Sequence, residues 1–466
     1  MSDEHVTQAK EQNSNGDDLP PGWVWTTLAD ATDPTRQRTN PQDYPHLPFV
    51  GMNHIEAHTM KLLGTIPSSE MRSSAEHFWP GDVLYGRLRP YLNKVYCADF
   101  EGLASGEFIV FRNVTHLVSR YLQYFLNSWD FVSFTSQVTE GDRPRISFDQ
   151  MADYPFPLAP LPEQQRIVAA IEAQFTRLDA AKAGLERLAA QLQRYRASVL
   201  KAACEGWLVS TEAELAQVEG RDYEDGSSLL ARILEERRQK WLVENPRKKY
   251  VEPSGPAVDG LPVLPVGWIW ATVEQVLTES LSNGRSVPSA DEGFPVLRLT
   301  ALKNGRIDLN ERKIGAWTEN DAKRYLVEKG DFYVSRGNGS LHLVGRGGLV
   351  EHEPDAVAYP DTLVRVRMTD DYDILYLRAL WDSNLIRQQI ETTARTTAGI
   401  YKINQQDIQR IFIPLPPLAE QSRIVAEVER RLSVIDALEA AVAANRMRAG
   451  RLRQAILKRA FAGRLV

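Results

Sequence analysis

A long internal repeat is the feature that most limits how this chain can fold. Residues 19–27 (LPPGWVWTT) return as residues 264–272 (LPVGWIWAT), and residues 157–168 (PLAPLPEQQRIV) return as residues 414–425 (PLPPLAEQSRIV). The second match continues without a gap to Val209 and Val466, while the offset grows from 245 to 257 residues along the repeat. A period this long indicates a duplicated domain rather than a stack of short repeats.

Each repeat ends in an apolar pattern with a period of seven residues. In both repeats, five apolar residues follow one another at a spacing of seven. This pattern predicts two long helices that pair as an antiparallel coiled coil, with two ordinary bundle helices as the alternative. Each helix would span about 43 residues, or ~64 Å at ~1.5 Å per residue. The predicted seam of the spacer helices consists of Ile171, Leu178, Leu185, Leu192 and Val199 in the first repeat, and Val428, Ile435, Val442, Ala449 and Ile456 in the second. Ala181, Leu188, Tyr195, Leu438 and Leu452 supply a second apolar line.

Glycines mark the predicted ends of both helices. Gly206 and Gly463 follow basic last turns and suit a left-handed helix cap. Between the repeats, an amphipathic helix is expected over 227–243, followed by the basic stretch 245–250 (NPRKKY). This segment is either a linker with a packed helix or a docking surface for a partner. The predicted domains are a disordered tail (1–18), a first recognition domain (19–157), a first spacer helix (158–209), the linker (210–260), a second recognition domain (261–413) and a second spacer helix (414–466).

The two halves before the helices have the pattern of α+β domains. Short strands are expected at 82–85, 108–111, 295–299, 331–334 and 362–366, and helices at 119–128 and 374–392. The predicted fold class is therefore α+β, with two repeated α+β domains separated by two long helices that form an antiparallel coiled coil. Trp23, Trp25, Trp268 and Trp270 alternate along a strand and are expected in the core or at a domain edge.

Basic and amide side chains gather in glycine-rich loops after predicted strands in both halves. Arg pairs with guanine and Asn with adenine, while Lys and Ser hold phosphates, so these loops predict DNA contacts rather than ordinary solvated hairpins. The candidate contacts are Arg87, Arg89, Asn93, Lys94, Arg143 and Arg145 in the first half, and Arg336, Asn338, Ser340, Arg346 and Lys402 in the second.

Motifs of self-contained enzymes are absent from the sequence. There is no P-loop and no Asp/Asn-Pro-Pro-Tyr/Phe methyltransferase segment, and the glycine-rich stretch 337–348 is followed by strand-like sequence rather than a helix. Asp291 with Glu311 and Lys313 matches a magnesium-dependent nuclease site only loosely. We therefore predict no catalytic residue, no metal site and no cofactor in this chain.

Composition sets further limits. Two cysteines, Cys97 and Cys204, cannot make a disulfide framework, and no long apolar run or signal peptide is present, so a cytoplasmic protein is expected. The net charge of −6 is unusual for a nucleic-acid binder. Either the basic surface is local, or partner subunits supply positive charge.

The repeated motifs resemble one known family. The proline-rich entry with Glu-Gln, the long helix ending in Leu-Lys-x-Ala-x-x-Gly-x-Leu-Val, and the opening Leu-Pro-x-Gly-Trp-x-Trp are similar to those of the specificity subunits of Type I restriction–modification enzymes. The inter-repeat helix with Glu235, Arg238 and Trp241 is similar as well. The resemblance covers nearly the whole chain after residue 18.

The resemblance implies that each half recognises one part of a split double-stranded DNA target and that the helices set the gap. It also implies two docked methyltransferase subunits, which bring S-adenosylmethionine, and restriction/translocase subunits, which bring ATP and Mg²⁺ chemistry. Two other classes remain open: a self-contained DNA methyltransferase or nuclease, and a coiled-coil adaptor that does not bind DNA.

Overall fold

The chain divides into two units in the computed structural model, which describes residues 19–35, 37–257, 260–397 and 399–466. Unit 1 holds residues up to 187 together with 442–466, and unit 2 holds residues 188–441. Helix α5 (Leu161–Glu205) begins in unit 1 and ends in unit 2, whereas α12 (Leu418–Phe461) begins in unit 2 and ends in unit 1. The expected tail 1–18 lies outside the described residues.

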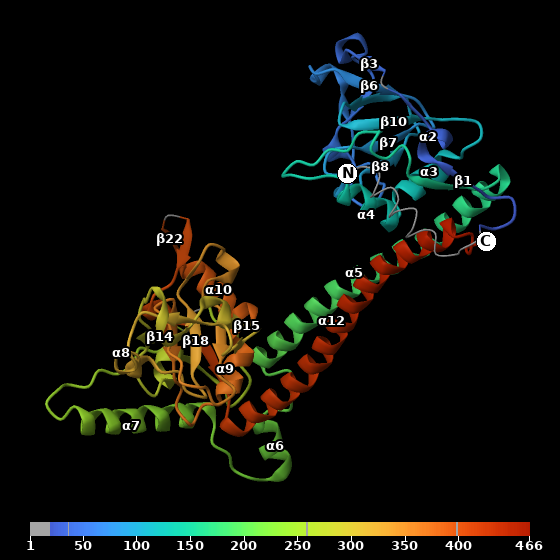
Figure 1. The fold of residues 1–466 in the computed structure, drawn as a ribbon. Helices are drawn as coiled ribbons and strands as arrows, with labels where there is room; N and C mark the ends of the chain where they lie inside the picture. The colour runs from blue at the N-terminus through green and yellow to red at the C-terminus, as the bar shows by residue number, and fades with distance from the viewer. Residues whose placement is uncertain (1–18, 36, 258–259, 398) are drawn as a thin grey trace. The chain divides into compact units, whose positions relative to one another are not determined.

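Unit 1 is built on two small sheets and a terminal strand pair (Figure 1). One sheet has the order β2-β10-β7-β8 and the other the order β3-β6-β9-β4-β5, while β1 pairs with β11. Their bounds are β1 Val24–Thr27, β2 Asp33–Thr35, β3 Arg38–Thr39, β4 Pro48–Val50, β5 Ile66–Pro67, β6 Ala75–Phe78, β7 Val83–Gly86, β8 Val95–Cys97, β9 Gly102–Ser105, β10 Phe108–Arg112 and β11 Pro155–Leu158. The short helices of this unit are α2 (Leu28–Ala31), α3 (Ser119–Leu126) and α4 (Trp129–Gln137).

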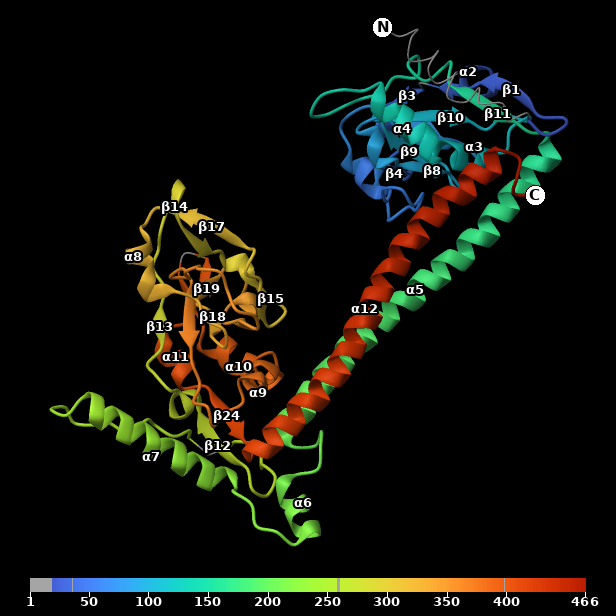
Figure 2. The ribbon, with the colours of Figure 1, turned by 60° about the horizontal axis from the view of Figure 1, so that its bottom comes forward.

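Unit 2 has a similar terminal strand pair and a larger main sheet, and its other strands are arranged differently (Figure 2). Its main sheet has the order β13-β21-β18-β20-β16-β15, β12 pairs with β24, and β14 with β17, while β19, β23 and β22 form a three-stranded sheet. The strands are β12 Ile269–Thr272, β13 Ser282–Asn283, β14 Ser289–Leu297, β15 Leu302–Lys303, β16 Arg306–Ile307, β17 Arg312–Gly315, β18 Phe332–Ser335, β19 Gly337–Asn338, β20 Gly347–Leu349, β21 Leu363–Val366, β22 Arg395–Thr397, β23 Ile400–Lys402 and β24 Phe412–Leu415. The helices are α6 Glu212–Glu219, α7 Gly226–Glu244, α8 Glu319–Ala322, α9 Ile374–Trp381, α10 Asn384–Thr393 and α11 Gln405–Gln409.

The repeat seen in the sequence is present at the level of individual contacts. Strand β7 pairs with β10 in unit 1 as β18 pairs with β21 in unit 2. In each unit an arginine at the end of an interior strand binds the aspartate of the repeated Gly-Asp: Arg112 reaches Asp82 at 2.7 Å, and Arg367 reaches Asp331 at 2.5 Å. Both aspartates are nearly fully buried and each is paired with its arginine, so this repeated ion pair belongs to the interior of each domain.

The glutamine of the Glu-Gln motif has the same structural task in both repeats. Gln164 accepts a hydrogen bond from the backbone N–H of Val118 at 2.8 Å, and Gln421 accepts one from that of Asp373 at 2.9 Å. Each amide also donates to a backbone carbonyl just before its own helix. Both side chains are fully buried, and a buried amide needs such partners. The motif therefore fastens each long helix to the loop that precedes α3 or α9.

The two long helices pair in antiparallel fashion, as predicted (Figures 1 and 2). In unit 1, Asp179 pairs with Arg453 and Glu186 with Arg446, and in unit 2 Arg196 pairs with Asp436 and Glu439. Residue numbers therefore fall in α12 as they rise in α5. Most of the predicted seam is buried, including Leu192, Val199, Val428, Ile435, Val442 and Ile456, while Ile171 packs in the core of unit 1. The caps are also confirmed, because Gly206 and Gly463 have φ of +73° and +65°.

The second apolar line of the helices is exposed, whereas a larger helical bundle would bury it. Leu188, Tyr195, Leu438 and Leu452 are 37–47 % exposed. A pair of helices has only one contact line, so the positions beside that line stay open unless another element covers them.

The secondary-structure predictions were correct in type and less so in bounds. The expected strands correspond to β7, β10, β14, β18 and β21, and the inter-repeat helix to α7. The helix expected over 374–392 is in fact two helices, α9 and α10, separated where Ser383 caps the second by accepting from the backbone N–H of Ile386. Helix α4 was not predicted.

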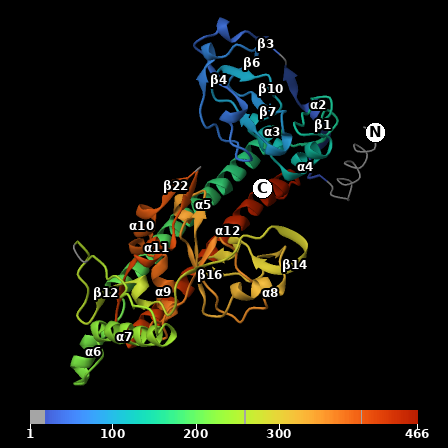
Figure 3. The ribbon, with the colours of Figure 1, turned by 90° about the vertical axis from the view of Figure 1, so that its left-hand side faces the viewer.

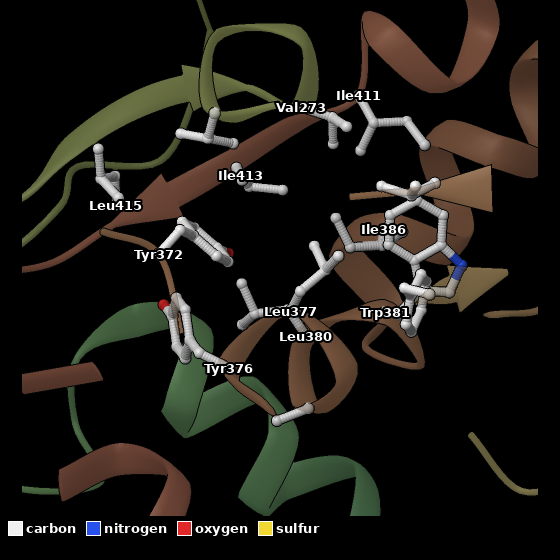
Figure 4. Close-up of a cluster of buried hydrophobic side chains, with 14 of the residues drawn as sticks. Val273, Tyr372, Tyr376, Leu377, Leu380, Trp381, Ile386, Ile411, Ile413 and Leu415 are labelled. Carbon is white, nitrogen blue, oxygen red and sulfur yellow. The ribbon is translucent and has the colours of Figure 1, made fainter. Parts of the chain in front are cut away.

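The core of unit 2 explains why α9 and α10 are separate elements. Figure 4 shows Leu377, Leu380 and Trp381 of α9 directed toward Ile386 of α10 and Ile413 of β24. All five side chains are at most 1 % exposed. The Trp381 indole also donates to the carbonyl of Gly345 at 2.8 Å. The break in the helix lets two apolar faces reach one core, which a single straight helix cannot do.

Candidate nucleic-acid interface

The central strand of each main sheet ends at an arginine in the same backbone setting. In unit 1, Arg87 follows β7; its N–H donates to the carbonyl of Glu107 at 2.8 Å, and its carbonyl accepts from Ile146 at 3.0 Å. In unit 2, Arg336 follows β18; its N–H donates to Thr362 at 2.8 Å, and its carbonyl accepts from Ile403 at 2.9 Å. The two arginines are therefore equivalent residues of the repeat, and both are half-buried.

These hydrogen bonds bring together loops that are far apart in the sequence. In unit 1, segment 86–94 meets segment 140–145, because Leu88 forms a bridge with Arg145 and the N–H of Arg89 donates to Pro144 at 2.8 Å. In unit 2, β19 pairs with β23, so that Gly337 lies opposite Lys402 and Asn338 opposite Tyr401. Within each unit, two loops that carry predicted DNA contacts are therefore neighbours in the fold.

The individual candidates differ in how accessible they are. Arg89, Arg143 and Lys402 are exposed, and Asn338 and Ser340 are half-buried beside Arg336. Arg145 is exposed but binds Glu107 at 2.7 Å, and this partner raises the pKa of the Arg145 guanidinium. A surface pair of this kind is weak and could open for a phosphate.

Three candidates are less available than the others: Lys94 and Arg346 have partners within the protein, and Asn93 is buried. The ammonium group of Lys94 donates to the carbonyl of Met52 at 2.5 Å, and burial lowers its pKa. Arg346 donates to Asp382 at 2.7 Å and to the carbonyl of His342 at 3.0 Å. Asn93 is only 1 % exposed, in a left-handed turn with φ of +43°. In this conformation Asn93 does not present its amide on the surface.

A hollow of about 300 Å³ lies beside Arg336. It is lined by Asn283, Arg336, Asn404, Gln405 and Gln406. Apart from Arg336, these residues were missed in the sequence because they come from β13 and from the start of α11, and only the run Asn-Gln-Gln at 404–406 could have drawn attention. The side-chain oxygen of Asn404 caps α11 by accepting from the N–H of Asp407 at 2.9 Å, which fixes the position of the run.

Residues considered for metal chemistry have other partners. Glu311 accepts from Lys303 at 2.8 Å, and the ammonium group of Lys313 donates to the carbonyl of Val287 at 2.7 Å. Within the described ranges, no three His, Cys, Asp or Glu side chains are grouped so as to hold a metal ion. In the same part of the chain, none of the helices has the length and apolar character needed to span a membrane.

The model of the Type I restriction modification DNA specificity domain matches this chain twice, at residues 29–188 and 279–442. The chain belongs to this family. The two matches cover most of the sequence and coincide with the two repeats, each including most of a long helix. The internal duplication is therefore a duplication of the specificity domain.

Named relatives agree with this assignment, and a solved structure shares the fold. The specificity subunit of the Type I restriction enzyme EcoKI from Escherichia coli strain K12 is 25 % identical over 96 % of this chain and 90 % of its own length. The EcoEI specificity subunit from Escherichia coli is 24 % identical over 91 % of this chain and 80 % of its own length. The crystal structure of the HsdS subunit from Thermoanaerobacter tengcongensis shares the fold, with a TM-score of 0.53, 22 % identity and coverage of 97 % of this chain and 100 % of that one.

Proposed function

We propose that this chain is the DNA-specificity subunit of a Type I restriction–modification complex. Each repeat recognises one part of a split double-stranded target through the surface around Arg87 or Arg336. The observation that carries the proposal is that one arginine, in one backbone setting, recurs between two polar loops in both specificity domains. An arginine with a purely structural role would form ion pairs within the protein, as Arg112 and Arg367 do.

The chemistry around Arg336 suits the edge of a base pair. A guanidinium can donate two hydrogen bonds to guanine, and the amides of Asn and Gln can pair with adenine. Arg336 lies with four amide side chains, those of Asn283, Asn404, Gln405 and Gln406, around the hollow of unit 2, and the Asn404 oxygen also caps α11. In the first repeat the positions equivalent to 404–406 hold Ser147, Phe148 and Asp149. The two domains would therefore recognise different base sequences.

The long helices offer apolar surface to partners. Leu188, Tyr195, Val434 and Leu438 in unit 2, and Met447 and Leu452 in unit 1, are all at least 37 % exposed. Exposed apolar stripes of this kind mark protein-binding sites. Two methyltransferase subunits would dock here and supply S-adenosylmethionine, and restriction/translocase subunits would supply ATP and Mg²⁺. Their basic surfaces would also offset the net charge of −6 of this chain around the DNA.

Arginine replacement tests the proposal. The complex with its methyltransferase subunits is first used to select its target from a duplex pool of random sequence. Arg336→Ala should then weaken binding to that target by about 1–3 kcal/mol, with little change in melting temperature. Arg324→Ala is the matched control, because Arg324 is an exposed arginine of the same unit that does not line the hollow.

Three results would contradict this account. If the pool yields no preferred sequence, the chain does not confer specificity. If Arg336→Ala weakens binding to random DNA as much as to the target, Arg336 contacts phosphate rather than a base. If Arg336→Ala lowers the melting temperature and leaves binding unchanged, the residue is structural.

A further inference from the structure

Two positive charges face each other across the β22–β23 hairpin of unit 2. Arg395 is the direct cross-strand partner of Lys402, so their side chains lie on the same face of the small sheet. Both residues are exposed. Figure 3 shows β22 projecting past α10 and α11, at the end of the unit away from α7.

Like charges at directly opposite positions destabilise a sheet. Elsewhere in this chain the same arrangement is neutralised. Lys303 lies opposite Arg306, but Lys303 binds Asp308 at 3.1 Å and Glu311 at 2.8 Å, and Arg306 binds Glu351 at 3.0 Å. Cross-strand charge is also used favourably in unit 1, where Arg38 lies opposite Glu76.

The Arg395–Lys402 pair has no such compensation. Among the residues that the structure describes, neither side chain takes part in an ion pair or a side-chain hydrogen bond. The third position in this row of the sheet is Gly337, which lies opposite Lys402 and adds no side chain. The row therefore holds two cations and a half-buried glycine, which contributes no acidic side chain that could neutralise them.

We propose that Arg395 and Lys402 form a phosphate clamp that holds the DNA backbone, next to the base-recognising surface around Arg336. This inference rests on the proposed function. DNA phosphate is the anion that fits, because Arg336 is the next residue after β18 and directly precedes Gly337, and the amide-lined hollow lies beside it. Phosphate contacts of this kind position a protein on the duplex without reading its sequence.

A second explanation must be separated from the clamp. Strand β22 is an edge strand of its sheet, and charged side chains on edge strands prevent pairing with other molecules. A reversal of charge distinguishes the two, because Arg395→Glu keeps a charged edge while it creates an opposite-charge pair with Lys402.

The experiment measures how binding of the assembled complex to a random-sequence duplex and to the selected target depends on salt. Each lost phosphate contact should reduce the slope of log K against log salt concentration by about 0.9. Arg395→Gln and Lys402→Gln should each show this loss, equally on both duplexes. Arg395→Glu should weaken binding further and should leave the melting temperature equal to or above that of the unchanged protein. Lys303→Gln is the matched control and should keep the original slope.

Three results would contradict the phosphate clamp. If Arg395→Glu binds both duplexes with the original slope, the clamp is wrong and the charges protect the edge, while the proposed function stands. If the losses occur on the target alone, the hairpin contacts bases and the clamp is again wrong. If the unchanged complex binds neither duplex, the proposed function fails and the clamp fails with it.

Discussion

At the scale of single residues, the two repeats use one motif with different surroundings. Glu420 is fully buried and accepts hydrogen bonds from the Trp268 indole at 2.9 Å and from the N–H of Glu212 at 2.8 Å. Burial raises the pKa of Glu420. Glu163, its counterpart, is half-buried, and the indole of Trp23 has no hydrogen-bond partner among the described residues. Helix α6 contributes to the difference, because its first residue, Glu212, supplies one of the two donors to Glu420.

This asymmetry makes a testable prediction about stability. Glu420→Ala leaves two buried donors without an acceptor, so it should lower the free energy of unfolding by roughly 1–3 kcal/mol. Glu420→Gln keeps an acceptor oxygen and removes a buried charge, so its cost should be smaller. Glu163→Ala, at the matching position of the first repeat, should cost less than half as much as Glu420→Ala. Calorimetric melting of the three variants checks this order, and equal losses at 420 and 163 would show that α6 does not matter.

Candidate site residues with matching positions in both domains could be chosen from the sequence where the repeat pointed to them. Arg87 and Arg336 follow repeated strands, and both lie at the same backbone position. Asn93 was chosen for its chemistry alone, yet the left-handed turn at 93 carries its side chain inward. Asn283 and Gln405 could not be found, because only the folded sheet brings β13 beside the start of α11.

At the scale of elements, the seven-residue period predicted the long helices well. It did not predict which apolar line would be covered, because that depends on what packs against the helix pair. Short helices were harder: the boundary between α9 and α10 is set by one capping serine, Ser383. For a long helix with a regular apolar period, the pattern is enough to predict the element. For short helices, a single capping residue decides where one helix ends and the next begins.

The antiparallel register predicts how the helix pair tolerates insertions. One extra heptad after Leu185 and another after Val442 enter the pair near the contact of Glu186 with Arg446, so the buried seam continues in register. The double insertion should fold and lengthen the pair by ~10 Å at ~1.5 Å per residue. If the helices set the gap of the target, that gap should grow by about one to three base pairs at ~3.4 Å each.

Single insertions provide the control for the double one. An insertion into only one helix mismatches the pair and should lower the melting temperature. Mapping of methylated sites in cells that carry each variant gives the gap directly. A double-insertion complex that methylates with the original gap would show that the helices do not act as the ruler.

In the molecule as a whole, the two domains share the same framework contacts because the sequence is repeated. The family model matches twice, and the equivalent arginines, glutamines and Gly-Asp turns recur in both specificity domains. Duplication followed by divergence of the loops gives two domains with one framework and different surfaces. Because the framework contacts lie within each unit, the account predicts that the two domains recognise DNA independently.

Exchange of one domain is the most direct test of this central claim. Residues 19–157 are replaced by the corresponding segment of another specificity subunit with a known target, and methylated sites are mapped in cells that also carry the methyltransferase subunits. We expect a hybrid target in which one half changes to that of the donor and the other half stays as it was. A change in both halves, or no change in either, from a complex that folds and methylates DNA would contradict it.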